Sequence, residues 1–158
     1  MRMRRPLARR DTGFTLLELI IACALLMILA SAALPLFRFT VVRTREHELR
    51  HNLREIRSAI DKYKDLADQS MIRVEVGSEG YPPDLETLVD GVAYGNSGTE
   101  KLRLLRRIPV DPMTGRAEWG MRSVQDDADS TSWSGNNVFD VYSKSTGTAL
   151  DGTKYSEW

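Results

Sequence analysis

The chain has 158 residues, with 22 basic and 22 acidic side chains, two histidines and one cysteine. This length provides for one modest globular domain. Without residues 1–13 the charge is −4, which argues against a nucleic-acid-binding protein, since such a protein usually carries a basic patch. The single cysteine, Cys23, excludes an intramolecular disulfide and is expected to pack as a small hydrophobic side chain.

A basic segment precedes a long apolar one at the N-terminus. Residues 1–13 hold five arginines and one acid, so the remaining chain has 17 basic and 21 acidic side chains and a charge of −4. The 19 residues from Leu19 to Phe37 are uncharged. As a helix they would span about 28 Å, close to the hydrocarbon thickness of a bilayer. We therefore expect a single-pass membrane helix whose arginine-rich N-terminus stays cytoplasmic.

One carboxylate, Glu18, stands where this apolar run begins. Moving a carboxylate to the centre of a membrane helix costs about 2.5–3.5 kcal/mol, so we expect Glu18 to have a function that offsets this cost. Its only nearby cation in a processed chain would be the new α-amine of Phe14 on a neighbouring copy, which predicts a role in assembly.

The segment Gly13-Phe14-Thr15-Leu16-Leu17-Glu18-Leu19-Ile20 resembles the leader junction of type IV pilins and type II secretion pseudopilins. The resemblance implies that a prepilin peptidase cleaves after Gly13 and methylates the new N-terminal Phe14. Glu18 would then be the fifth mature residue, and Pro35 matches a proline that the family has within the span. The alternative is an ordinary signal peptide, for which residues 30–32 offer a cleavage site.

The helical pattern continues beyond the apolar run. Apolar side chains recur with spacings of four, three, four, three and four at Leu49, Leu53, Ile56, Ile60, Tyr63 and Ala67. With neither Gly nor Pro between Phe37 and Asp68, one helix from Phe14 to about Asp68 is predicted, with a kink or melted turn near Pro35. We expect the apolar stripe to pack within the chain rather than in a coiled coil.

Charged side chains on this helix suggest ion pairs between neighbouring turns. Glu46 and Arg50, and likewise Arg57 and Asp61, are four residues apart. That spacing places the two members of each pair next to each other on a helix surface. The sequence therefore predicts two ion pairs within the helix.

The rest of the chain shows a short helical pattern at 82–89, turn chemistry at 111–115 and strand-like segments at 117–122 and 138–143. These patterns predict an α+β fold, in which the long helix packs on a small antiparallel sheet. The expected organisation is a leader (1–13), a transmembrane part (14–37), an amphipathic periplasmic part (38–68) and a globular region (69–158).

A looser resemblance to the G-type, or major, pseudopilin of type II secretion covers most of the chain. It is carried by Tyr81-Pro82, Leu85, Leu88-Val89, Ile108-Pro109, Asp111-Pro112, Val141-Tyr142-Ser143 and Trp158. The resemblance implies the type IV pilin-like fold. The polar stretch at 125–137 departs from the family pattern.

Three segments could bind a metal. His47-Glu48-Leu49-Arg50-His51 fits the H-E-x-x-H pattern of zinc proteases, but the chain has no further histidine for a third ligand. The acidic segment 127–131 resembles the start of an EF-hand and then lacks its glycine and its glutamate. For the loop at 145–153, the resemblance implies a structural calcium with Asp151 as a ligand, and the alternative is a plain turn.

The resemblance thus implies a non-enzymatic filament subunit that requires no cofactor. Its expected partners are further copies of itself, other pseudopilins, the prepilin peptidase, an inner-membrane assembly platform and the membrane, with no nucleic acid. The subunit would form a periplasmic pseudopilus that drives protein export. A type IV pilin for adhesion, motility or DNA uptake, and a membrane zinc protease, are the alternatives.

Overall fold

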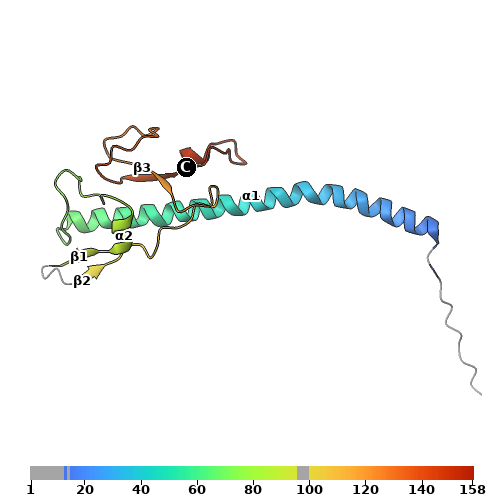
Figure 1. Ribbon diagram of the computed structural model, residues 1–158, viewed down its shortest axis with the longest axis horizontal. Helices are drawn as coiled ribbons and strands as arrows, with labels where there is room; N and C mark the ends of the chain where they lie inside the picture. The colour runs from blue at the N-terminus through green and yellow to red at the C-terminus, as the bar shows by residue number, and fades with distance from the viewer. Residues whose placement is uncertain (1–12, 14, 96–99) are drawn as a thin grey trace, which may run out of the picture. The chain divides into compact units, whose positions relative to one another are not determined.

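The computed structural model describes residues 13, 15–95 and 100–158, and the side chains of 32–38 lie outside this description. The chain divides into two compact units, Met1–Thr40 and Val41–Trp158. A 53-residue helix, α1 (Leu16–Asp68), passes from the first unit into the second (Figure 1). The predicted long helix is therefore confirmed. It is helical through Pro35, so the melted turn expected there does not form.

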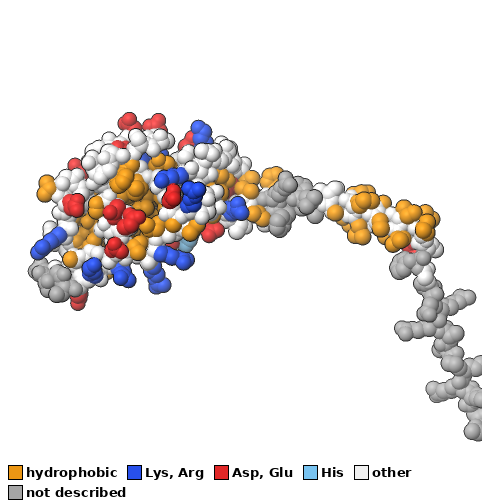
Figure 2. Space-filling view, viewed as in Figure 1, with side chains coloured by type: hydrophobic (Ala, Val, Ile, Leu, Met, Phe, Trp, Pro, Cys, Tyr) orange, Lys and Arg blue, Asp and Glu red, His pale blue; other side chains and the backbone are white. Residues whose placement is uncertain are grey.

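In the first unit, the described residues of α1 present apolar side chains to solvent. These side chains appear as hydrophobic atoms along the helix in Figure 2, and their exposed fractions run from 52% at Ile21 to 78% at Leu16. Among the described residues, no helix has the length and hydropathy of a membrane span.

In the second unit, α1 supplies one wall of the hydrophobic core. Leu49, Ile56 and Ile60 are fully buried, and Leu53 and Tyr63 are nearly so. They pack with Leu88, Trp119, Val138 and Val141 from the remainder of the chain. The predicted apolar stripe is therefore confirmed as a buried face, and burying each large side chain contributes about 1.5–3 kcal/mol.

The remaining elements are short. They are α2 (Glu86–Asp90), β1 (Val92–Tyr94), β2 (Glu100–Leu102), β3 (Trp119–Arg122), β4 (Asp140–Ser143) and the 3-10 helix η1 (Tyr155–Glu157). Strands β1 and β2 form one antiparallel pair, and β3 and β4 form another, with Gly120 opposite Tyr142. Figure 1 shows β3 and the β1–β2 pair on opposite sides of the C-terminal half of α1.

The sheet differs from the prediction in two respects. We expected one sheet from two strands, and the structure adds the β1–β2 pair in a part of the chain where we predicted no strand. The strand expected at 138–143 begins only at Asp140, and Phe139 is half exposed beside Tyr81, with ring centroids 5.3 Å apart. Three-residue strands carry too little periodicity to be recognised in sequence.

Close packing between β3 and β4 depends on one glycine. A Cβ atom built on Gly120 would overlap the ring of Tyr142, which lies directly over this residue. Tyr142 is buried, and its hydroxyl donates to Thr131 O at 3.1 Å. Because Gly120 has no side chain, the Tyr142 ring can pack directly against its backbone.

The turn at 111–115 is held by one buried carboxylate. Asp111 is fully buried, and its two oxygens accept hydrogen bonds from Met113 N at 2.8 Å and Ser143 Oγ at 2.6 Å. From α1, Asn52 donates to Val110 O at 2.9 Å. These bonds tie the predicted Asp-Pro turn to both β4 and the long helix.

Candidate functional site

The predicted cleavage junction lies just outside α1. Gly13 is exposed and not helical, and Phe14 lies outside the described residues. Thr15 caps the helix, because its Oγ1 accepts from Glu18 N at 3.2 Å and its carbonyl accepts from Leu19 N at 3.1 Å. The Thr-Leu-Leu-Glu sequence is an N-terminal capping pattern that sets the start of the helix at this point. Gly13 therefore precedes the helix and is exposed, and cleavage after it stays a prediction.

Glu18 lies in the first turn of α1 and is exposed. The unpaired amides of a helix N-terminus carry a partial positive charge, so a carboxylate here is favourable. The position thus gives Glu18 a local role in helix stability in addition to the predicted role in assembly.

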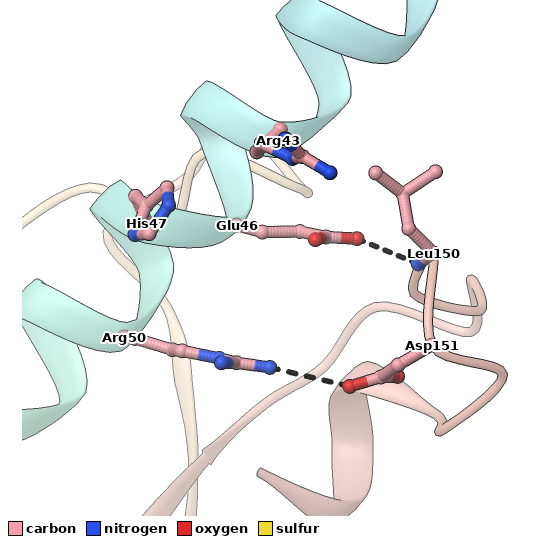
Figure 3. A pocket seen from close by; sticks show the side chains of 6 residues that line it. All are labelled: Arg43, Glu46, His47, Arg50, Leu150 and Asp151. Carbon is pink, nitrogen blue, oxygen red and sulfur yellow. Dashed lines mark hydrogen bonds and ion pairs between the residues drawn. The ribbon is translucent and has the colours of Figure 1, made fainter.

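A second group of side chains joins the middle of α1 to the C-terminal loop (Figure 3). Glu46 Oε1 accepts hydrogen bonds from Leu150 N at 2.8 Å and from the Tyr155 hydroxyl at 3.2 Å. Burial, and then the bond to Glu46, raise the pKa of the Tyr155 phenol. One carboxylate on the helix therefore holds two points of the loop.

Arg50 completes this connection one turn further along. Its Nη2 lies 3.3 Å from Asp151 Oδ2, and its guanidinium lies 4.0 Å from the centre of the Trp158 ring. Trp158 Nε1 in turn donates to Thr153 Oγ1 at 2.7 Å. We call the set Glu46, Arg50, Asp151, Tyr155 and Trp158 the C-terminal clasp. It holds the segment that the resemblance associates with calcium.

The ion pairs predicted within α1 do not form. Glu46 and Arg50 both reach the C-terminal loop instead of each other. Arg57 bonds to Asp140 on β4 with an Nε–Oδ1 distance of 2.7 Å, and not to Asp61. Both predictions were wrong because partners more than 80 residues away in sequence engage these side chains. Carboxylates of Asp151 and Asp140 accept from Arg50 and Arg57, and the Leu150 amide and the Tyr155 hydroxyl donate to Glu46.

Asp151 already has protein partners for its carboxylate. Oδ1 accepts from Thr153 Oγ1 at 2.6 Å and from Thr153 N at 3.0 Å, and these bonds lower the pKa of Asp151 below its usual range. Calcium takes six to eight oxygen ligands. Among the described residues there is no group of three or more His, Cys, Asp or Glu side chains placed to bind a metal. With the Arg50 cation beside it, the Asp151 carboxylate as folded does not fit a calcium ligand, and calcium in this loop stays a prediction that the resemblance implies.

The two histidines of the H-E-x-x-H pattern are exposed on α1. His47 lies at a cavity of about 330 Å³ with the two arginines Arg43 and Arg50 (Figure 3). Guanidinium groups oppose the binding of a second cation at this place. The zinc-protease alternative is therefore disfavoured on electrostatic grounds.

The polar stretch at 125–137 contains a network that sequence analysis did not predict. Asp126 Oδ2 accepts from Ser123 N at 2.8 Å and from Ser134 N at 3.2 Å, and the bond from Ser123 is the main reason why the pKa of Asp126 is lowered. Buried Asn137 accepts from Val124 N at 3.1 Å. A Ser-x-x-Asp spacing was the available signal, but it occurs too widely to identify the network.

Residues 8–34 match the family model described as the prokaryotic N-terminal methylation motif. The match covers residues 8–13 of the expected leader and the first part of α1, and it includes Gly13, Phe14 and Glu18. No curated protein and no solved structure shows significant similarity to the chain. The motif and the α+β arrangement, with its long N-terminal helix and small antiparallel sheets, support a type IV pilin-like protein.

Proposed function

We propose that the chain is the precursor of a filament subunit, cleaved after Gly13 and methylated at Phe14. The methylation motif at 8–34 carries this proposal. It is supported by the exposed, non-helical Gly13 and by the Thr15 cap, which begins the helix just beyond the junction. The enzyme expected to act on this site is a prepilin peptidase.

The apolar part of α1 would anchor the precursor in the inner membrane and then pack in the filament core. The leader arginines favour a cytoplasmic N-terminus and a periplasmic C-terminal unit. Between helices in lipid, close packing and polar contacts drive association, and the filament core offers the same chemistry. An assembly platform in the inner membrane and other pilin-like subunits would be the partners.

Within this class we favour a G-type pseudopilin of type II secretion, whose short periplasmic filament drives protein export. Many type IV pilins close a C-terminal loop with a disulfide, which a chain with the single cysteine Cys23 cannot form. Here the C-terminal clasp connects that loop to α1 through Arg50 and Glu46. A type IV pilin for adhesion, motility or DNA uptake is the alternative, since the methylation motif is common to both.

Mass spectrometry of protein extracted from membranes tests the processing step. The expected mature chain begins with N-methylated Phe14, and Gly13→Leu should leave the leader uncut. No atom lies within 4 Å of a Cβ built on Gly13, so this variant should fold like the natural chain. A mature N-terminus after Ala32, or an intact leader in cells with active peptidase, would contradict the proposal. Neighbouring genes distinguish its finer form: a secretin with a secretion ATPase favours export, and a retraction ATPase favours a pilus.

A further inference from the structure

One face of α1 in the second unit carries charges that are separated by sign along the helix. The basic stripe consists of Arg43, His47, Arg50, Arg54 and Arg57, with spacings of four, three, four and three. The acidic stripe continues this spacing with Asp61, Asp65 and Asp68. Because a helix turns about 100° per residue, both stripes lie on one face, on the side away from buried Leu49 and Ile56.

This face is accessible and hollowed. Of the eight side chains, Arg57 is half buried and the others are exposed. A cavity of about 330 Å³ is bordered by Arg43, His47 and Arg50, and a second cavity of about 310 Å³ is bordered by Arg50, Arg54 and Arg57. Arg50 borders both cavities, so the basic stripe borders two neighbouring depressions at which a second surface can lie.

Some of these charges already have partners in the chain. Arg50 pairs with Asp151, Arg57 with Asp140, and Asp68 with Lys64. Within the described residues, no ion pair engages the charged side chains of Arg43, Arg54, Asp61 and Asp65. The face thus retains unpaired cations at one end and unpaired carboxylates at the other.

We propose that the basic stripe is the docking surface for the acidic stripe of a second copy of this chain, in parallel orientation. A displacement of 18 residues is five helical turns, or about 27 Å, and returns the same face to the same side. It places Asp61 of the displaced copy at Arg43, Asp65 at His47 and Asp68 at Arg50. This displacement brings together Arg43 and Asp61, neither of which has an ion pair among the described residues of one chain.

The parallel arrangement rests on the proposed function, in which all N-terminal helices enter the same membrane and the same filament core. Without that constraint, an antiparallel pair would match Arg43 with Asp68 and Arg50 with Asp61. A nucleic acid would also be attracted to the basic stripe, but it would be repelled by the acidic stripe on the same face. A second copy is the occupant that satisfies both signs of charge at once.

The stripes would determine register more than affinity. Exposed ion pairs contribute little individually, whereas like charges placed opposite each other disfavour the wrong partner. Replacing one side chain with alanine should therefore change assembly only slightly. Reversing its charge should change assembly strongly, because the new contact is repulsive.

The test reverses charges in the full-length protein and measures assembled protein by chemical cross-linking in native membranes. Arg43→Glu and Asp61→Arg should each lower the assembled fraction about fivefold or more. Combining the two in one chain should restore assembly, because each altered residue again meets its opposite charge in the neighbouring copy. Both side chains are exposed, so each variant should melt like the natural chain in detergent, which separates assembly from folding.

The matched control combines Arg43→Glu with Asp68→Arg. This combination should not restore assembly in the parallel arrangement. If it restores assembly and Arg43→Glu with Asp61→Arg does not, the parallel arrangement is overturned in favour of an antiparallel pair. Failure of both combinations to restore assembly, or no loss in either single variant, would also overturn it. Salt-sensitive binding of a short DNA duplex that Arg43→Glu abolishes, with assembly unchanged, would assign the stripe to nucleic acid instead. A natural chain that never assembles would contradict the proposed function itself.

Discussion

Arg57 on α1 and Asp140 on β4 are joined by a short ion pair, with 2.7 Å between Nε and Oδ1. The same guanidinium donates through Nη2 to Val141 O at 3.0 Å and to Trp158 O at 2.9 Å. One side chain on the helix thus connects a strand and the C-terminal segment, which lie 83 to 101 residues away in sequence.

We predict that Arg57→Ala lowers the free energy of unfolding by about 1–2 kcal/mol, because hydrogen bonds to charged groups contribute up to about 3 kcal/mol and this site is partly exposed. Asp140 keeps Arg122 at 3.7 Å, which limits the loss. Denaturant unfolding of the full chain in detergent measures the effect. Arg54→Ala is the control, since Arg54 is on the same helix without an ion pair in the described residues and should change little. Equal effects of the two variants would contradict the connection.

The contact between Gly120 and Tyr142 predicts that Gly120 tolerates no larger side chain without a loss of stability. Replacing glycine with alanine in a strand normally stabilises the folded state, because alanine loses less backbone entropy on folding. Here the added methyl group must displace the Tyr142 ring, so Gly120→Ala should lower the free energy of unfolding by about 1–3 kcal/mol. The same change made in a Tyr142→Ala background should cost much less, and a double-mutant cycle from thermal melting measures the difference. Additive effects would show that the ring and the glycine are independent.

The C-terminal clasp predicts how the protein responds to calcium. A metal that binds only the folded state raises the melting temperature by mass action. Because Asp151 is engaged by Thr153 and Arg50, we expect the same melting midpoint with calcium and with chelator, and a lower midpoint for Arg50→Ala in both. A calcium-dependent increase that Asp151→Ala abolishes would instead establish the metal site implied by the resemblance.

Acid should weaken the two loops that contain Asp126 and Asp151. Hydrogen bonds from Ser123 and Thr153 respectively lower the pKa of these carboxyl groups below the ordinary 3.8. Their stabilising contribution is therefore present above that value and is lost as pH falls through the lower folded-state pKa. The difference in melting temperature between the natural chain and Asp126→Asn, followed from about pH 6 to about pH 2, should stay constant above the ordinary pKa of 3.8 and shrink as the pH is lowered below it. A difference that stays constant across this range would exclude the ionised carboxylate as its source.

Glu18→Ala should leave leader cleavage and folding of the second unit intact and strongly reduce filament assembly and secretion. Its predicted partner is the methylated α-amine of Phe14 on a neighbouring copy, and removing one charge of a buried pair costs about 3–5 kcal/mol. Thr15→Ala is the control, because it removes the 3.2 Å cap at the start of the helix and keeps the charge. If both variants assemble equally poorly, the helix start accounts for the effect; if Glu18→Ala assembles normally, Glu18 has no role in assembly.

The sequence by itself determined the length of α1 and its buried face, and it predicts a processing junction just before the helix. These features depend on local and periodic properties: an absence of Gly and Pro between Phe37 and Asp68, an apolar side chain at every third or fourth position, and a helix cap at Thr15. Each of these properties can be recognised in a few consecutive turns of one helix.

Only the tertiary structure decided which partners Glu46, Arg50 and Arg57 have, and that the β1–β2 pair forms. The helical spacing favoured neighbours four residues away, but each such exposed pair contributes only a few tenths of a kcal/mol. Oxygens and amides of β4 and the C-terminal loop, brought to α1 by burial of the apolar stripe, provide several bonds at once. Partners this far apart in sequence leave no periodic signal, so packing of the core selects them.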